Sequence, residues 1–434
     1  MSAADHGVEK VPSLPEASRP GGNGKITRAQ WLVLAAAVFG WMFDGVEIAL
    51  PPIMGRPALI ELLGPEMASD KNIGPLLGVL GAMFLVGAAA GGVLFGWLGD
   101  RFGRVRTMIF SVLTYSLFTG AAYWAQVPWH LMALRFIASM GMGGQWSLGV
   151  ALVVECWPGL TRPLLAGVIG AAANVGFLMI SVLGWVFPVH PESWRWIMLA
   201  GASPAVLVFF IVLFVPESER WKAAVKKTPS QSPIREIFAG DLRPKTLIAI
   251  ALAAIALLGT WGSVQWVPYW VDKTLMPGDP SAKALTQIWS SVGAIIGCLI
   301  APLSGGRWGR RPVYFAMCLV SLVSCLYMFL VLTTFDWWFL AVITLVGGVT
   351  ASFYGWLPLY LPELFPTRVR ATGQGLSFNF GRILAAIGVL VGTGQLVALL
   401  GGYEKAGAII SLVYVLGLFV IWLAPETKGK PLPE

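Results

Sequence analysis

Apolar runs about as long as a lipid bilayer is thick recur along the whole sequence, and they constrain the fold more than any other feature. A helix needs about twenty apolar residues to cross the hydrocarbon core, because it rises about 1.5 Å per residue. Hydrophobic residues make up 56% of the chain and charged residues only 12%, which is typical of a polytopic membrane protein. We predict an all-α integral membrane protein with twelve transmembrane helices, at about 29–54, 73–98, 105–126, 129–156, 163–187, 194–215, 245–271, 284–305, 312–333, 336–361, 371–399 and 404–424.

Positive charge predicts how these helices are oriented. Of the 30 Lys and Arg residues, 22 fall on one side of the predicted membrane if the N-terminus is inside, and cytoplasmic loops are the ones enriched in Lys and Arg. We therefore expect both termini in the cytoplasm, residues 272–283 outside, and a location in the inner (plasma) membrane. The same distribution explains the net charge of +8 without nucleic acid, because the basic residues lie in short loops rather than on one soluble face.

The chain divides into two halves of similar length. We expect a disordered cytoplasmic tail at 1–28, a first six-helix half at 29–215, a cytoplasmic linker at 216–244, a second half at 245–424 and a short tail at 425–434. Short patterns recur between the halves: Glu155-Cys156-Trp157-Pro158 returns as Glu363-Leu364-Phe365-Pro366, and Pro216-Glu217 returns as Pro425-Glu426. The chain therefore looks duplicated.

The densest charge of the first half lies between the second and third apolar runs, in Gly96-Trp97-Leu98-Gly99-Asp100-Arg101-Phe102-Gly103-Arg104. Its pattern, G-x-x-x-D-R-x-G-R, resembles the signature of the loop between helices 2 and 3 in the major facilitator superfamily. A degenerate copy follows about 206 residues later, with Gly306 in place of Asp100. The resemblance implies twelve helices in two six-helix halves that are related by pseudo-two-fold symmetry.

The resemblance also implies a gate at the inner surface. Asp100 is then expected near the start of helix 11, where a helix N-terminus favours an anion. Arg101 and Arg104 would pair with Glu155 and Glu217. In the second half the matching gate residues would be Arg307, Arg310 and Glu363, without the latch that Gly306 removes. The alternative is that these charges are solvated and serve only membrane topology.

Four charged residues fall well inside predicted helices, away from their ends, where each costs about 2.5–3.5 kcal/mol on insertion scales: Asp44, Glu47, Arg135 and Arg382. Asp44-Gly45-Val46-Glu47 and the run Arg135 to Trp146 resemble signatures of the metabolite:proton symporters, closest to the sialate and monocarboxylate branch and the aromatic-acid branch. The resemblance implies that Asp44 and Arg135 face one another across the cavity. Asp44 would carry the coupled proton, with Glu47 in reserve. The alternative is a permanent ion pair.

Arg382 lies near the middle of helix 11, and no acid lies mid-span in helices 7 to 12. Because a guanidinium matches a carboxylate bidentately, we expect Arg382 to bind the substrate anion. An Arg held by backbone carbonyls or by a protein acid is the alternative. Further cavity candidates are the polar and aromatic residues Gln145, Asn174, Trp261, Gln265, Tyr269, Tyr354 and Asn379.

These observations predict a secondary transporter rather than an enzyme. No catalytic triad, phosphate loop or metal spacing occurs in the sequence, so no cofactor is expected. We expect proton-coupled symport of a small organic anion, such as a lactate-like monocarboxylate or an aromatic acid, by a monomer. The alternatives are a symporter of sugar or sialic acid, and a nutrient sensor that has kept the fold.

Overall fold

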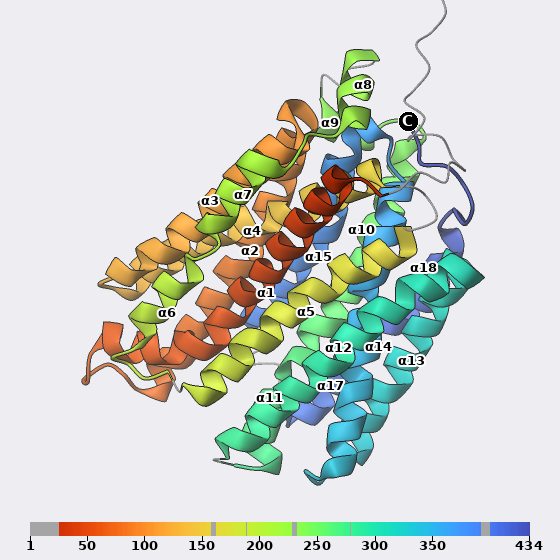
Figure 1. Cartoon of the computed structure of the whole chain (residues 1–434). Coiled ribbons are helices and arrows are strands. Elements are labelled where there is room, and N and C mark those ends of the chain that lie inside the picture. The colour runs from red at the N-terminus through yellow and green to blue at the C-terminus, as the bar shows by residue number, and fades with distance from the viewer. Residues whose placement is uncertain (1–25, 158–161, 188, 228–231, 278, 392–399) are drawn as a thin grey trace, which may run out of the picture.

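The computed structural model describes residues 26–157, 162–187, 189–227, 232–277, 279–391 and 400–434. This part of the chain is a bundle of long helices (Figure 1). The first half contains α1 (Arg28–Leu63), α2 (Asp70–Phe102), α3 (Arg104–Ala121), α4 (Pro128–Cys156), α5 (Arg162–Val186), α6 (Trp194–Gly201) and α7 (Ala205–Phe214). The second half contains α10 (Leu242–Gly262), α11 (Val267–Trp270), α12 (Pro280–Trp308), α13 (Arg310–Val331), α14 (Trp337–Tyr360), α15 (Arg370–Val391), α17 (Tyr403–Ser411) and α18 (Val413–Leu423).

Eleven segments of the described chain are long and apolar enough to cross a membrane, and each matches a predicted span. The remaining predicted span, 371–399, begins with α15, but residues 392–399 lie outside the described part. The predicted tail at 1–28 also falls almost wholly outside it. The protein is therefore a multi-pass membrane protein with two six-helix halves, as its sequence predicts.

Three local predictions differ from the structure. Helix α1 continues to Leu63, well beyond the predicted end near residue 54, although it contains Pro51, Pro52 and Pro57. The seventh span is not one continuous helix, because α10 ends at Gly262 and short 3₁₀, α and π turns carry the chain on to Leu275. The linker contains two short helices, α8 (Glu219–Lys227) and α9 (Pro233–Ile237).

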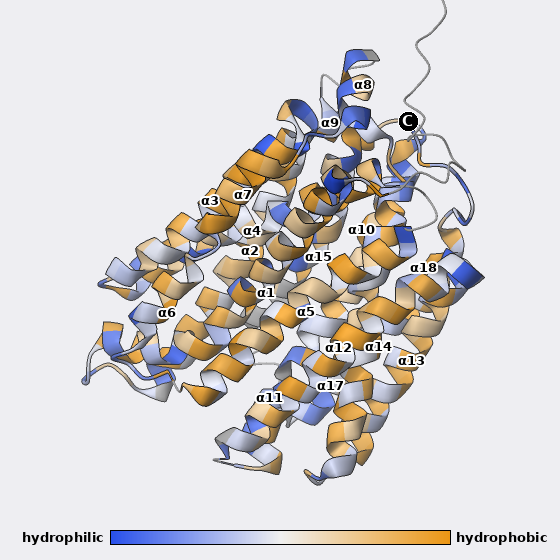
Figure 2. Cartoon of the chain, viewed as in Figure 1, coloured by the Kyte–Doolittle hydropathy of each residue, from blue (hydrophilic) through white to orange (hydrophobic). Residues whose placement is uncertain are grey.

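Small residues allow the helices to approach closely. A Cβ at Gly45 of α1 would lie 1.9 Å from the carbonyl oxygen of Ala173 in α5, and a Cβ at Gly176 of α5 would lie 1.9 Å from that of Met42 in α1. Glycine at both positions therefore lets the two backbones meet. Large apolar side chains point outward along the bundle, among them Phe209, Leu213, Phe419 and Leu423, and hydrophobic colour covers the middle of the outer helices (Figure 2). These faces suit contact with lipid tails.

The two halves meet mainly where α2 packs on α15 and α5 packs on α12. One end of the bundle carries α8, α9 and the segment that follows α18 (Figure 1). We call it the linker end. The start of α1 and the end of α4 also lie there, since the Gln30 side chain donates to the Cys156 carbonyl over 3.0 Å.

Candidate functional site

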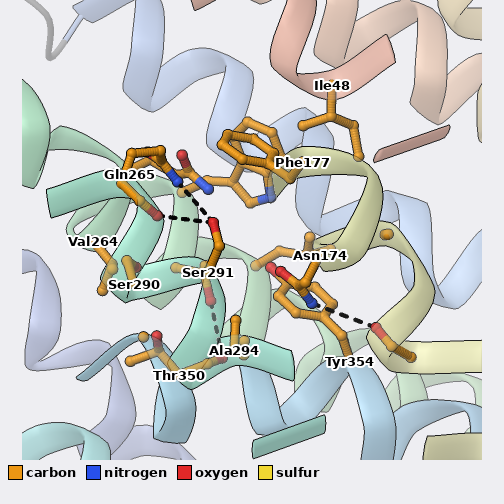
Figure 3. Close-up of a pocket in the computed structure, with 18 of the residues that line it drawn as sticks. Ile48, Asn174, Phe177, Val264, Gln265, Ser290, Ser291, Ala294, Thr350 and Tyr354 are labelled. Atoms are coloured by element: carbon orange, nitrogen blue, oxygen red, sulfur yellow. Dashed lines mark hydrogen bonds between the residues drawn. The ribbon is translucent and has the colours of Figure 1, made fainter. Parts of the chain in front are cut away.

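A cavity of about 80 Å³ lies between the two halves. Its lining comes from α1 and α5 of the first half, and from α10, α12, α14, α15 and the turn at 264–266 of the second. Figure 3 shows Asn174, Gln265, Ser291 and Tyr354 around it, with Phe177 as part of its apolar wall. The cavity is therefore shared by both halves, as alternating access requires.

Five of the predicted cavity residues line it: Asn174, Trp261, Gln265, Tyr354 and Arg382. Gln145 and Asn379 are buried but are not part of the lining. The Tyr269 side chain lies outside the described part of the chain. Sequence reasoning missed the polar residues of α12, which are Gln287, Ser290 and Ser291. Their three- and four-residue spacing places them on one helix face, a signal that was readable in the sequence.

Arg382 is held by its own helix. Its Nη1 donates to Asn379 Oδ1 over 2.6 Å, and its guanidinium carbon lies 5.3 Å from the centre of the Phe378 ring. Only 2% of Arg382 is exposed, and its Nε has no hydrogen-bond partner among the described residues. The guanidinium therefore keeps donor capacity at the cavity wall.

Asp44 is fully buried in α1, and neither of its carboxylate oxygens has a hydrogen-bond partner in the described part of the chain. Arg382 of the other half is near enough for its charge to act favourably on ionised Asp44. A buried carboxylate without hydrogen bonds is costly when it is ionised. Asp44 and Arg382 thus carry opposite charges on different halves, without a direct hydrogen bond between them among the described contacts.

The expectation that Arg135 faces Asp44 is wrong. Arg135 Nη1 lies 2.6 Å from Glu47 Oε2, and its Nη2 donates to the Glu47 backbone carbonyl over 3.0 Å. Thr119 accepts a further bond from Arg135 over 3.4 Å. Glu47 binds the Arg135 guanidinium through both its carboxylate and its backbone carbonyl, so Arg135 is paired with Glu47. This geometry is that of a stable buried ion pair.

Gln145 lies against Gly40 of α1, where a Cβ would come 1.9 Å from its Nε2. Both polar atoms of its amide lack partners within the described chain. The glycine makes room for this amide, which lies one helical turn from Asp44 toward the linker end.

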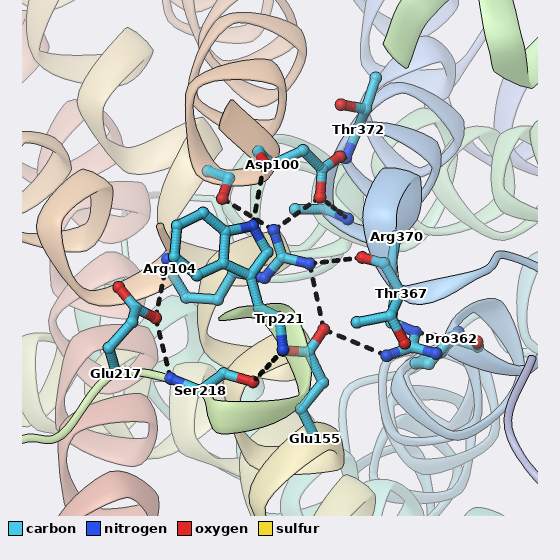
Figure 4. Close-up of polar contacts among 12 residues, drawn as sticks. Asp100, Arg104, Glu155, Glu217, Ser218, Trp221, Pro362, Thr367, Arg370 and Thr372 are labelled. Atoms are coloured by element: carbon cyan, nitrogen blue, oxygen red, sulfur yellow. Dashed lines mark hydrogen bonds and ion pairs between the residues drawn. The ribbon is translucent and has the colours of Figure 1, made fainter. Parts of the chain in front are cut away.

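A cluster of buried polar groups joins the halves at the linker end (Figure 4). We call Asp100, Arg104, Glu155, Glu217 and Ser218 the first-half cluster. Arg104 Nη1 lies 2.6 Å from Asp100 Oδ1, and its Nη2 lies 3.1 Å from Glu155 Oε1. The guanidinium thus connects the ends of α2 and α4, which are adjacent helices of the same half.

The same groups reach into the second half. Asp100 accepts bonds from the backbone N–H groups of Ala371, over 3.2 Å, and Thr372, over 2.7 Å, in the first turn of α15. Glu155 lies 3.1 Å from Arg370 Nη1, and Arg104 also donates to the Thr367 carbonyl over 2.7 Å. An acid thus meets a helix N-terminus, and the two halves are tied together at the linker end.

The linker completes this cluster. Glu217 accepts from the backbone N–H groups of Arg104 and Val105, each over 3.0 Å. Ser218 donates to Glu155 over 2.5 Å, and Trp221 Nε1 donates to the Asp100 carbonyl over 2.9 Å. The beginning of α8 is therefore docked on the loop that carries the signature motif.

The second half has a partial copy, which we call the second-half cluster: Gly306, Arg310, Glu363, Glu426 and Thr427. Arg310 binds Glu363 bidentately, with Nη2 to Oε1 at 2.6 Å and Nε to Oε2 at 3.0 Å. Glu426 accepts from the backbone N–H groups of Arg310 and Arg311, and Thr427 donates to Glu363. These hydrogen bonds stay within the second half.

Two predicted gate residues lie outside both clusters. Arg101 is exposed, with its guanidinium 5.5 Å from the Trp97 ring and 5.7 Å from the Phe102 ring. Its expected pairing with Glu155 or Glu217 is therefore wrong. Arg307 is also exposed, and only its backbone carbonyl takes part, as acceptor from Lys428 Nζ over 2.7 Å. In each motif the first arginine is thus exposed, whereas the arginine three residues later is buried.

Comparison with known proteins places the chain among membrane transporters. The family described as Major Facilitator Superfamily matches residues 32–389. A Haemophilus influenzae protein named for metabolite transport is 30% identical over 424 residues, which cover 94% of this chain and 99% of that one. The cis,cis-muconate transport protein of Acinetobacter baylyi is 30% identical over 320 residues, or 71% of this chain and 76% of that one. The solved structure of the proton:xylose symporter XylE has a TM-score of 0.77 at 19% identity, covering 93% of this chain and 98% of that one.

Proposed function

We propose, from the premise that the chain belongs to the major facilitator superfamily and is a transporter rather than an enzyme, that it couples the uptake of a small organic anion to a proton. The substrate is a carboxylate of the size of lactate or an aromatic acid. The relative named for cis,cis-muconate, an organic acid, supports this class. The XylE likeness, at 19% identity, supports the fold alone.

One observation carries the proposal. Arg382 is the one Lys, Arg, Asp or Glu among the described residues that line the cavity. A buried guanidinium with spare donors in a small cavity favours a bidentate anion. Once Asp44 is protonated, a neutral sugar would leave that charge without a counter-ion, so the lining favours an acid over a sugar.

The pair of Asp44 and Arg382 supplies the coupling. While Asp44 is ionised, it competes with the substrate carboxylate for the field of Arg382. When Asp44 takes up a proton, the guanidinium is free to hold the substrate. Binding of the proton and binding of the anion therefore strengthen each other, and this linkage is reciprocal. Glu47 does not carry the coupled proton, because its carboxylate already forms an ion pair with Arg135.

Alternating access then requires the linker end to open. The first-half cluster holds that end closed, so the cavity would load from the opposite end and release after the cluster breaks. The distribution of Lys and Arg supports a cytoplasmic linker end and an inner-membrane location. A closed linker end with an available Arg382 corresponds to a state that is ready to receive substrate from outside.

Substitution of Arg382 tests the proposal. Arg382→Lys should weaken binding nearly as much as Arg382→Ala, because an ammonium lacks the planar fork of donors. Binding of lactate, benzoate and cis,cis-muconate to the purified protein is the measurement, with Arg106→Lys, at an exposed position of α3, as the control. Unchanged affinity in both Arg382 variants would contradict the proposed anion site.

A further inference from the structure

The residues that hold Arg382 are themselves held by α4 of the other half. Phe378, whose ring lies 5.3 Å from the guanidinium carbon, stacks on Trp146 of α4 with ring centres 4.0 Å apart and planes 15° apart. Asn379, which accepts from Arg382 over 2.6 Å, donates to the Gly143 carbonyl of α4 over 3.4 Å. Both supports of the arginine therefore end on one short stretch of α4.

The contact is a buried joint between the halves. Trp146, Phe378 and Asn379 are each 1% exposed. Trp41 of α1 packs its ring edge-on against Phe378, with centres 6.4 Å apart. Gly92 of α2 leaves the space that Asn379 occupies, since a Cβ there would lie 1.9 Å from its Nδ2. Several helices of the first half thus shape one socket for two neighbouring residues of α15.

We propose that Trp146 is a positioning residue that couples closure of the linker end to the presentation of Arg382. When the linker end opens, α15 must leave α4, and the Trp146–Phe378 stack and the Asn379–Gly143 hydrogen bond break together. Arg382 then loses the ring and the amide that orient it, so the anion is held less tightly in the open state. The part of the inference that concerns Arg382 rests on the proposed anion site. The part that concerns the contact between α4 and α15 does not, because that contact needs no substrate.

Spin labels on the two halves test the joint without any ligand. Cysteines replace the exposed Arg106 of α3 and Arg243 of α10, which both lie at linker-end helix starts, in a Cys156→Ser background. An offset stack contributes enough to change the ratio of open to closed molecules by about two- to tenfold. Trp146→Leu should raise the ratio of molecules with long label distances to those with short ones by that factor. Trp146→Phe, which keeps a stacking ring, should restore the parental ratio.

Two controls separate this role from ordinary packing. Trp270 is similarly buried, but among the described residues its ring contacts are tilted ones with Phe329 and Phe339 of the second half, so Trp270→Leu should leave the distances unchanged. In a Phe378→Leu background, Trp146→Leu should add no further shift, because the partner ring is already gone. A parental distribution for Trp146→Leu, or additive shifts in the double variant, would overturn the proposal.

Binding of radiolabelled cis,cis-muconate to the same purified variants tests the coupling of this contact to Arg382. Trp146→Leu should weaken binding in proportion to the fall in the closed fraction that the distances record, and Trp146→Phe should restore it. A distance shift with parental affinity would overturn the coupling to Arg382. Absence of muconate binding by the parent protein would contradict the proposed substrate class, and the distance measurement would then decide the inference.

Discussion

The first-half cluster crosses to the other half of the molecule, whereas the second-half cluster remains within its own. Both contain a buried Arg that binds a Glu at the end of the fourth or tenth span, and both receive a Glu from the segment that follows the half. Only the first has an Asp that caps a helix of the opposite half. Both copies of the motif therefore form a similar local structure, but only the first copy bonds to the opposite half.

The second-half cluster lacks this bond because the residues differ at both the acceptor position and a donor position. Gly306 lacks the carboxylate that Asp100 provides. Pro163, which corresponds to Ala371 by its place after the first residue of α5 or α15, lacks the N–H that would donate. A Cβ at Gly306 would lie 2.8 Å from Pro163 Cγ. The acceptor and one of the two donors are thus absent together, and the two helix ends pack directly instead.

This asymmetry teaches that the two clusters do different work. We propose that the first-half cluster sets how readily the linker end opens, because its bonds must break when the halves separate. The second-half cluster stabilises the end of its own half and attaches the segment after α18. The four predictions that follow test this division, from the largest expected effect to the smallest.

Glu155→Gln should have the largest effect. It leaves Arg104 and Arg370, both fully buried, without a shared carboxylate, and loss of one partner from a buried pair costs about 3–5 kcal/mol. The linker-end distance between labels should lengthen and the thermal unfolding midpoint should fall. The matched variant Glu363→Gln should lower the midpoint but keep the linker end closed. Equal opening in both variants would contradict the division.

Asp100→Asn should open the linker end less than Glu155→Gln does. The amide keeps the volume and one acceptor but loses the charge that favours the N-terminus of α15, an effect of about 1–2 kcal/mol, or about five- to thirtyfold in the closed to open ratio. Expression should persist while transport slows, as initial rates of labelled-substrate uptake would record. An uptake rate equal to that of the parent protein would indicate that the motif serves only membrane topology.

Gly306→Asp should not create a second latch. Its side chain meets Pro163, so we expect a loss of about 1–3 kcal/mol from overpacking with no additional closure. Combining it with Pro163→Ala restores both an N–H and space. The double variant should regain thermal stability and hold the linker end closed more often than the parent. A single Gly306→Asp variant that already does so would show that the proline is not the obstacle.

Glu426→Gln should have the smallest effect, below about 1 kcal/mol, because the side chain is only half-buried and solvent screens its charge. Partial burial would raise the pKa of Glu426, but the N–H groups of Arg310 and Arg311 outweigh it and lower the pKa below its usual 4.5. Its contribution is thus present above 4.5 and is lost as the pH falls through the lower folded value. Midpoints of parent and variant, compared across this range, should converge on acidification. A gap that widens instead would contradict the assignment.

The sequence predicted the spans and the position of Asp100 near α15, because bilayer thickness and a specific motif limit both strongly. It did not predict which acid Arg135 binds. Asp44 and Glu47 lie three residues apart on one helix face, so the choice depends on the rotation of α1 against α4, which no local pattern encodes. The break after Gly262 was also missed, because the run stays apolar through it.

The central claim is that Asp44 carries the coupled proton and competes with the substrate for Arg382. The most direct test compares two assays on Asp44→Asn protein in proteoliposomes, accumulation of labelled carboxylate driven by an inward proton gradient, and exchange of labelled for unlabelled substrate. Asparagine mimics the protonated acid, so accumulation should be abolished while exchange continues, with anion affinity that no longer varies with pH. Asp44→Asn protein that still concentrates substrate in response to the proton gradient would contradict the account.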